Sequence, residues 1–464
     1  KRFIIKDKYG NRYIFGGDDN AIEYSIVQKA DIIRTSTGVN NSNVWKAFAT
    51  ADAWMLTRIE RADGEVIIFE YERGGVPIVL RDIHHGEIFT SADAYYMSGQ
   101  DDTHHDMTMG YKRNLNFLFL LPTYLKSIRC LMSGDELNFA AEKSQELQFA
   151  IDESDFKSYV ADLSSEYSVV GPFSYSQFQE ENYYRKLVSI TGNSRDIRFS
   201  YTDNSLTRLK LNKIEICKCD GQKDGEYTFA YNETSLPAYN SRQTDIWGYY
   251  NGISYADLLG GFGSGMTARR IAVKEKMAAE ILTCVTYPTG GRTEYTYEPH
   301  RYSKKALPFD FSPVACESEG EAGGLRIKTI TDYSIDGEVP QVRTFEYSEN
   351  GVSSGILSAE GECKIEGSQS FINNVLNFTG SYVLYNEMPI LPLSDTDGNH
   401  VTYSFVREIF PDGSYIAYNL NHDDEEELGE DFKAEFDKHI DVLSKLQLVI
   451  PVEGRDYGIL NSRC

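Results

Sequence analysis

One pattern recurs along this chain. An apolar segment is followed by a turn that usually contains glycine, and then by a segment that usually ends in an aromatic residue, one further residue and a tyrosine. A repeat of this kind constrains the fold strongly, because each copy must bury its apolar face against its neighbours. The copies differ in turn length, and they occupy residues 3–15 (a shorter relative), 56–71, 187–201, 211–231, 282–297, 327–347 and 401–418.

Each copy contains the residues that an antiparallel hairpin needs. The segment after the turn alternates with period two, which is typical of a strand with two different faces. Glycine supplies the positive φ that tight hairpin turns require. It does so at Asp63-Gly64, Gly290-Gly291, Asp336-Gly337 and Asp412-Gly413.

The closing aromatic pair predicts how the hairpins associate. Phe199 and Tyr201 are two residues apart, so they share one face of their strand. The same holds for Phe69 and Tyr71, Phe229 and Tyr231, Tyr295 and Tyr297, and Phe345 and Tyr347, whereas Ile416 replaces the first aromatic residue in the last copy. One hairpin is marginal in water, but stacked hairpins bury a continuous aromatic ladder. We therefore predict a mainly β fold, in which repeated antiparallel β-hairpins form an extended curved sheet or partial β-shell with a few short helices.

Some segments depart from the strand alternation. Residues 142–166, 266–281 and 430–448 favour short helices, because they carry helix formers or apolar residues at helical spacing. Residues 232–265 and 301–324 are rich in glycine, serine, proline or charge, which predicts loops.

These departures divide the chain, whose 464 residues are too many for one ordinary core. We expect four regions: an N-terminal β-hairpin region at 1–135, a helical insertion at 136–180, central β-hairpin repeats at 181–350, and a C-terminal β-hairpin region with a terminal helix at 351–464.

Charge and hydropathy exclude some classes of partner. The formal net charge of −24 argues against nucleic acid and against an anionic membrane surface. The longest apolar run, Leu115 to Leu121, is too short to span a bilayer and is expected to form a buried strand. No signal peptide begins at Lys1, so we expect a mature or excised segment. Seven scattered cysteines do not indicate a disulfide framework, and no cofactor is expected.

Several segments resemble the large RHS/YD-repeat-like proteins of the Bacteroidetes cell surface. The similar segments are YPTGG followed by TEYTYEPH at residues 287–300, DIWGYYNG at 245–252, GGLRIKTI at 323–330 and the copy at 56–71. The regular YD series, and the self-cleaving core and toxin of some relatives, are not present in this sequence. The resemblance implies an extracellular or cell-surface scaffold, since in the wider family such hairpins wind into a hollow β-shell that can enclose a cargo.

One candidate metal site is a polar cluster. His104, His105 and Asp106 follow Asp101 and Asp102, and both residue types ligate metals. The spacing matches no established metal motif, and adjacent side chains on a strand point apart. A solvated polar loop is the interpretation that we favour.

One candidate ligand site is aromatic. Trp247, Tyr249 and Tyr250 would form a sugar-stacking platform if they were exposed. They can equally hold a loop against the sheet, and we favour packing because large aromatic side chains usually bury most of their area. The sequence contains no motif that nominates a catalytic residue.

We therefore expect a non-enzymatic extracellular β-scaffold that encloses or displays a partner. The partner is an unknown protein or glycan, or other segments of the same polypeptide. Two alternatives remain open at this point: a carbohydrate-binding or adhesion module, and a glycan-degrading hydrolase, whose paired carboxylates the sequence alone does not identify.

Overall fold

The protein is mainly β, with a large antiparallel sheet and short helices. The computed structural model describes residues 2–34, 40–45, 49–74, 78–96, 105–106, 111–146, 153, 174–181, 183–239, 241–254, 269–306, 313–335, 337–359, 364–372, 376–386 and 399–419. No helix among these residues is long and apolar enough to cross a membrane.

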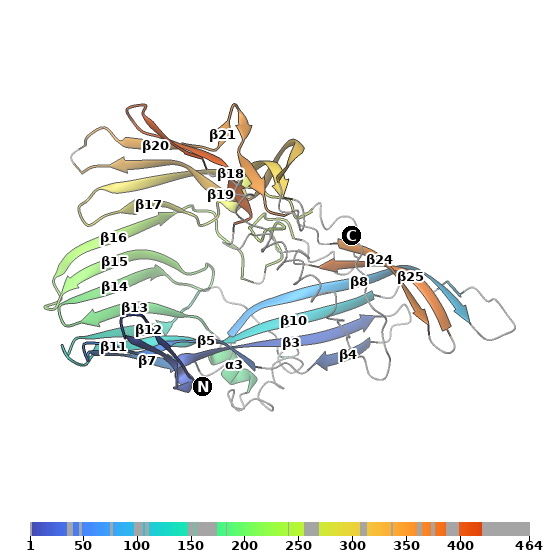
Figure 1. Ribbon diagram of the computed structural model, residues 1–464, viewed down its shortest axis with the longest axis horizontal. Helices are drawn as coiled ribbons and strands as arrows, with labels where there is room; N and C mark the ends of the chain where they lie inside the picture. The colour runs from blue at the N-terminus through green and yellow to red at the C-terminus, as the bar shows by residue number, and fades with distance from the viewer. Residues whose placement is uncertain are drawn as a thin grey trace.

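Eighteen strands form the larger sheet. All except two follow one series in which each strand pairs antiparallel with the next (Figure 1). In spatial order the strands are β1 (Arg2–Lys6), β2 (Arg12–Gly16), β6 (Leu56–Glu60), β7 (Val66–Arg73), β11 (Thr123–Cys130), β12 (Glu136–Lys143), β13 (Arg185–Gly192), β14 (Arg195–Thr202), β15 (Lys210–Lys218), β16 (Lys223–Tyr231), β17 (Leu282–Thr286), β18 (Arg292–Ala306), β19 (Pro313–Tyr333), β20 (Gln341–Glu346), β27 (Phe405–Ile409) and β28 (Tyr415–Asn419). The remaining two are β23 (Gly355–Leu357), which is parallel to β18, and its antiparallel partner β26 (Val401–Tyr403).

A second sheet has eight strands. Its strands are β24 (Lys364–Ile372), β25 (Leu376–Asn386), β8 (Ile78–Tyr96), β10 (Tyr111–Leu121), β3 (Ile22–Arg34) and β4 (Asn40–Trp45), with β5 (Ala49–Trp54) beside β3 and β9 (His105–Asp106) beside β8. Phe119 and Leu121 are buried, which confirms the strand predicted around them. The smaller elements are β21 (Ser348–Glu349), β22 (Val352–Ser353), η1 (Asp19–Ala21), α3 (Tyr175–Glu181) and α5 (Lys274–Met277).

The predicted hairpins are confirmed. The copies form β1–β2, β6–β7, β13–β14, β15–β16, β17–β18, β19–β20 and β27–β28. The last copy differs from the prediction, because its first segment is split. Val401–Tyr403 forms β26 and pairs with β23, whereas β27 begins at Phe405 and pairs with β20 and β28. The amide of Ser404 donates to the Ser354 carbonyl at the break (3.1 Å).

The closing tyrosine of five copies makes the same hydrogen bond. Its hydroxyl donates to the backbone carbonyl of the residue that opens the copy: Tyr71 to Leu56 (2.9 Å), Tyr201 to Leu187 (2.7 Å), Tyr231 to Leu211 (2.7 Å), Tyr297 to Leu282 (2.6 Å) and Tyr347 to Ile327 (2.8 Å). The second residue of each of these copies has no partner on the strand that precedes the copy, so the register of that pairing shifts by one residue. A β-bulge of this kind disrupts the local ladder, so the tyrosine hydroxyl supplies a donor where the backbone pairing is interrupted.

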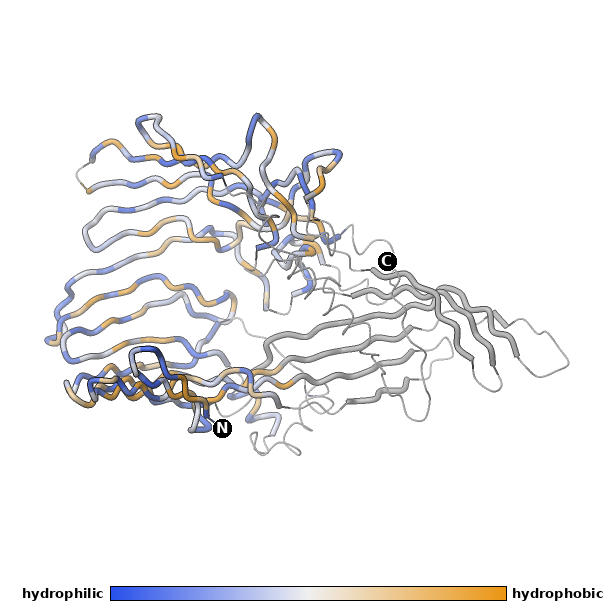
Figure 2. Tube along the Cα trace, viewed as in Figure 1, coloured by the Kyte–Doolittle hydropathy of each residue, from blue (hydrophilic) through white to orange (hydrophobic). Residues whose placement is uncertain are grey.

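The two faces of the central strands differ in chemistry. Cross-strand pairing aligns Phe199, Ile214 and Tyr227 on one face of β14, β15 and β16. It aligns Arg198, Glu215 and Glu226 on the other face, where Lys213 forms an ion pair with Glu215 (2.8 Å). Figure 2 shows the resulting alternation of hydrophilic and hydrophobic residues along these strands. Among the described side chains of β12 to β17, Cys217 is the only apolar one that is fully buried.

The predicted loop at residues 301–324 is wrong. β18 continues to Ala306 and β19 begins at Pro313, so most of this segment is strand. The acidic and glycine-rich composition suggested a loop, but pairing with β18 satisfies the backbone whatever the local preference.

The predicted helices have a mixed outcome. Within 266–281, the structure has the four-residue helix α5. Within 142–166, Glu142 and Lys143 end β12, and residues 147–166 other than Glu153 lie outside the described residues, as does 430–448. The predicted insertion at 136–180 begins with β12, a strand of the large sheet, and its last part contains the start of α3.

Candidate functional site

A group of polar side chains with shifted pKa values lies where β18 and β19 separate at a bulge. The pairing moves from Pro299 opposite Leu325 to His300 opposite Ala322, so Gly323 and Gly324 are skipped. Gly324 has a φ of +83°, which a residue with a Cβ rarely adopts. We call the loop 245–251 together with this bulge the docking site.

Both glycines are needed because the loop approaches the backbone of β19 closely. A Cβ on Gly323 would lie 2.3 Å from Oδ2 of Asp245, and a Cβ on Gly324 would lie 2.7 Å from the ring of Tyr249. The segments DIWGYYNG and GGLRIKTI are therefore two halves of one contact. Their residue types are explained together, since only glycine permits this approach.

Asp245 organises the loop from inside. Its side chain is 0% exposed, and Oδ1 accepts the backbone amides of Trp247 (3.0 Å) and Tyr249 (2.9 Å). Arg270 donates to the Asp245 carbonyl (2.9 Å). Oδ2 of Asp245 is buried and has no hydrogen-bond partner within the described part of the chain. Burial raises the pKa of Asp245 to about 6, because the charged carboxylate loses its hydration.

Two histidines lie beneath the loop. Nε2 of His400 donates to the Gly323 carbonyl (2.6 Å), since a carbonyl oxygen can only accept. The His400 ring lies 5.7 Å from that of Tyr249 and 5.1 Å from that of His300, measured between centroids. Nδ1 of His300 is 2.7 Å from the hydroxyl of Tyr403. Burial lowers the pKa of both histidines, and for His300 the nearby His400 and Arg326 lower it further, to about 4. Both rings are therefore neutral at pH 7.

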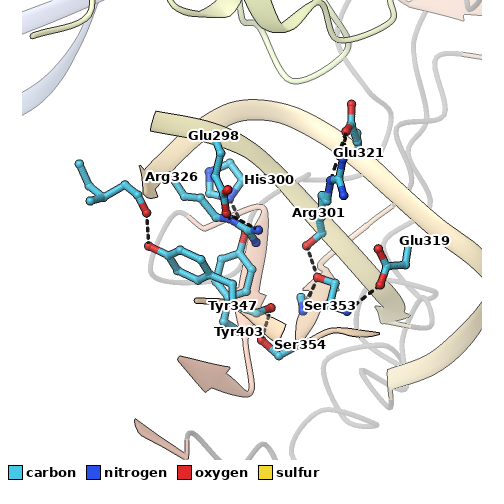
Figure 3. Close-up of polar contacts among 12 residues, drawn as sticks. Glu298, His300, Arg301, Glu319, Glu321, Arg326, Tyr347, Ser353, Ser354 and Tyr403 are labelled. Atoms are coloured by element: carbon cyan, nitrogen blue, oxygen red, sulfur yellow. Dashed lines mark hydrogen bonds and ion pairs between the residues drawn. The ribbon is translucent and has the colours of Figure 1, made fainter. Parts of the chain in front are cut away.

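Arg326 contacts an acidic residue and two tyrosines of the site. Its guanidinium forms an ion pair with Glu298 (2.7 Å) and lies over the rings of Tyr347 (4.2 Å) and Tyr403 (5.0 Å). A cation over an aromatic face is attracted by the ring quadrupole, more strongly when it is desolvated, and the Arg326 side chain is only 10% exposed. Figure 3 shows Arg326 between Glu298 and the two tyrosines, with His300 beside them.

Serine contacts fix the short parallel strand beside this group. Oγ of Ser353 donates to the Arg301 carbonyl (2.8 Å), and Glu319 accepts the Ser353 amide (2.7 Å), as Figure 3 shows. Ala322, Leu357 and Val401 form a small buried cluster against which Trp247 and Tyr403 pack.

The arrangement joins five segments of chain, at residues 245–251, 298–301, 322–326, 347 and 400–403. Shifted pKa values and a buried carboxyl are features of active sites, but structural networks share them. Nδ1 of His300, Nε2 of His400 and the hydroxyl of Tyr403 contact other protein groups. The role that these contacts support best is therefore a structural one, in which they hold loop 245–251 against the sheet.

A cavity of about 510 Å³ lies elsewhere, over β1, β2, β6, β7 and β11. Its wall carries Arg2, Arg58 and Lys126 together with Asp18 and Glu70. Arg58 already pairs with Glu60 (2.9 Å), and Glu70 with Arg129 (3.2 Å). The cavity thus has mixed charge that is partly neutralised by its own neighbours.

The aromatic candidates lie in the docking site. Trp247 has a buried Nε1 with no partner among the described residues, Tyr249 is 38% exposed, and Tyr250 lies near the Lys276 ammonium (5.8 Å to the ring centroid). Trp247 and Tyr249 contact His400 and the glycine bulge. A ligand-binding role for the three residues stays a prediction.

The metal candidates are placed only in part. His105 and Asp106 form β9, while their side chains and all of His104 lie outside what the structure describes. In the described residues, no group of three or more His, Cys, Asp or Glu side chains has a metal-binding arrangement.

Sequence reasoning did not nominate Asp245, His300, Arg326 or His400. His300 ends the quoted segment TEYTYEPH, and Asp245 opens DIWGYYNG, so both stood within the family-like segments. Their association was not visible, because the segments are separated by tens of residues and meet only through the β18–β19 bulge.

Comparisons with known proteins assign little to this chain. No protein-family model and no curated protein matches it. The crystal structure of TcdB2-TccC3-TEV is similar at 11% sequence identity, over 81% of this chain and 16% of that chain, with a TM-score of 0.23. At this TM-score the similarity carries no argument about the family or the function of the chain.

Proposed function

We propose that the chain is a non-enzymatic β-scaffold, located outside the cell, that encloses or displays a polypeptide partner against the apolar face of its large sheet. The observation that carries this proposal is the apolar row that includes Phe199, Ile214 and Tyr227, whose side chains are only partly buried. The RHS/YD-like segments support it as well, because that resemblance implies a shell around a cargo.

The physical argument concerns uncovered apolar area. Removing apolar surface from water is worth about 25 cal/mol per Å². A contiguous apolar surface that a domain does not cover itself is a common mark of an interaction site. The opposite face carries Arg198, Glu215 and Glu226, and such charged side chains are well solvated without a partner. The apolar face is therefore the one that gains free energy when a partner binds.

Binding to an unfolded polypeptide tests the proposal. The probe is reduced, carboxymethylated α-lactalbumin, and its affinity is measured by fluorescence anisotropy. We expect the chain to bind it, and Phe199→Lys to weaken binding at least tenfold. Ser200→Lys is the matched control, because Ser200 is the next residue of β14 and lies on the charged face.

Three outcomes contradict the proposal. One is no binding by the parent chain, and another is an equal loss of binding in both variants. The third is binding on a glycan array, or release of reducing ends from a polysaccharide, without polypeptide binding. That last result favours a carbohydrate-binding module or a glycan hydrolase instead. Circular dichroism and thermal unfolding of both variants show whether the fold is kept.

A further inference from the structure

The cavity over β1, β2, β6, β7 and β11 lies outside the docking site. Its volume of about 510 Å³ is within the range of about 300–1,000 Å³ that is usual for small-molecule sites. Gly16 and Gly17 form part of its wall, and both have positive φ (69° and 91°), which turns the chain out of β2 towards η1. The strands and this turn together border a space of ligand size.

Two β-bulges border the same cavity. Thr57 has no partner on β2 and Lys126 has none on β7, and both residues line the cavity. The Thr57 hydroxyl donates to the carbonyls of Ile14 (3.1 Å) and Gly16 (2.9 Å). A bulge bends its strand and redirects a side chain, and bulges are frequent beside functional sites. The cavity therefore lies where two strands interrupt the regular sheet.

Part of the lining is aliphatic. Ile14, Arg58 and Ile68 lie directly opposite one another across β2, β6 and β7, so their side chains share one face of the sheet. Ile14 and Ile68 are half-buried, and a ligand with an aliphatic body removes more of their surface from water.

The charged lining residues include both signs, and three of them are unpaired. Arg2, Lys126 and Asp18 form no ion pair with any other residue that the structure describes. Oδ1 of Asp18 accepts the backbone amide of Asn20 (3.0 Å). Opposite charges thus line the cavity without neutralising each other.

The other two charged lining residues have protein partners. Arg58 shares the carboxylate of Glu60 (2.9 Å) with Arg12 (2.7 Å), and Glu70 pairs with Arg129 (3.2 Å). Two arginines on one glutamate leave a net positive charge on this side of the cavity. A ligand with a single charge, of either sign, therefore meets like charge in the lining, which disfavours its binding.

We propose that this cavity binds a small zwitterion with an aliphatic body, such as an aliphatic dipeptide with free termini. Lys126 and Arg58 bind its carboxylate, Asp18 binds its ammonium group, and its side chains lie over Ile14 and Ile68. Hydrogen bonds between charged groups are the stronger kind, and each terminus makes one. An extended dipeptide is about 7 Å long, so its two termini can reach different sides of the cavity.

Calorimetric titration with four forms of one dipeptide tests the charge requirement. L-leucyl-L-leucine is a zwitterion at pH 7, its N-acetyl derivative is an anion, its C-terminal amide is a cation, and the doubly blocked form is neutral. We expect the full chain to bind the zwitterion at least tenfold more tightly than any other form. Equal affinity for all four forms, tighter binding of a singly charged form, or no binding of the zwitterion overturns the proposal.

Two substitutions test where the zwitterion binds. Lys126→Gln removes the unpaired cation, and Asp18→Asn removes the unpaired carboxylate but keeps an N-cap acceptor for η1. Each should weaken binding of the zwitterion at least fivefold. Lys328→Gln is the matched control, because Lys328 is an exposed lysine at a bulge of β19 and does not line the cavity. Thermal unfolding shows whether each variant keeps its fold. Binding by Lys126→Gln and Asp18→Asn that equals that of the control overturns the proposal.

Discussion

The tyrosine–carbonyl hydrogen bonds give the most direct test of how the repeat is stabilised. In β16, the hydroxyl of Tyr231 donates to the Leu211 carbonyl (2.7 Å) beside the bulge at Asn212. Tyr231→Phe removes this donor and keeps the ring. A hydrogen bond of this kind contributes about 1 kcal/mol net, and a buried acceptor left without a partner costs about 1–3 kcal/mol. Because Tyr231 is only half-buried and water can reach the site, we expect a loss near 1 kcal/mol.

The chain provides a matched control on the same strand. Tyr227 lies four residues before Tyr231 on the same face, and its ring packs edge-on against Tyr287 (6.0 Å between centroids). Tyr227→Phe should change the free energy of unfolding by less than about 0.5 kcal/mol. Urea unfolding followed by circular dichroism measures both variants, with the midpoint shifted and the m value unchanged.

The combined variant extends the test. Replacing the closing tyrosines of all five copies by phenylalanine should cost about 5 kcal/mol if the sites act independently. That is a large part of the stability of an ordinary domain, which is about 5–15 kcal/mol. An equal loss for Tyr227→Phe and Tyr231→Phe, or no loss for either, refutes the reasoning. The aromatic rings alone would then explain the repeat.

The remaining predictions concern the docking site. Burial raises the pKa of Asp245 from 3.8 to about 6, so its protonated form contributes stability below pH 4 that is lost as the pH rises through 6. One pKa unit corresponds to about 1.4 kcal/mol. As the pH rises from about 4 to about 8, the free energy of unfolding of Asp245→Asn should therefore increase by about 3 kcal/mol relative to that of the parent chain. Parallel pH profiles of the two unfolding free energies would contradict this. The pKa of His300 is lowered from 6.5 to about 4, so its neutral form contributes stability above pH 6.5 that is lost as the pH falls towards 4. His300→Gln should therefore flatten the fall in melting temperature over that range, and an unchanged slope would assign the effect to other groups. Gly324→Ala should destabilise by about 1–3 kcal/mol more than Gly337→Ala. Both glycines have positive φ, but an added Cβ would lie 2.7 Å from the Tyr249 ring at Gly324 and would meet nothing within 4 Å at Gly337. Equal melting temperatures for these two variants would show that the contact does not matter.

Much of the repeat architecture was predictable from the sequence. Period-two alternation and glycine turns are local properties, and they specified the hairpins from Phe3 to Tyr418 with one split copy. The closing tyrosines were recognised as members of an aromatic ladder. Their hydrogen bonds to Leu56, Leu187, Leu211, Leu282 and Ile327 were not, because the acceptor is a backbone atom and leaves no mark in the sequence.

The docking site depended on the tertiary structure. Gly323 and Gly324 looked like part of a loop, and they became a strand bulge only because β18 pairs on either side of them. Asp245, His300 and His400 acquire shifted pKa values from burial, and burial is set by segments that the chain brings together over long sequence separations. Local patterns thus determined where the repeated hairpins lie and which face of their strands is apolar, but not that residues 313–324 belong to a strand. The order in which the strands meet, and the polar groups that this order buries, came from long-range pairing, since those contacts depend on where the whole chain places its backbone.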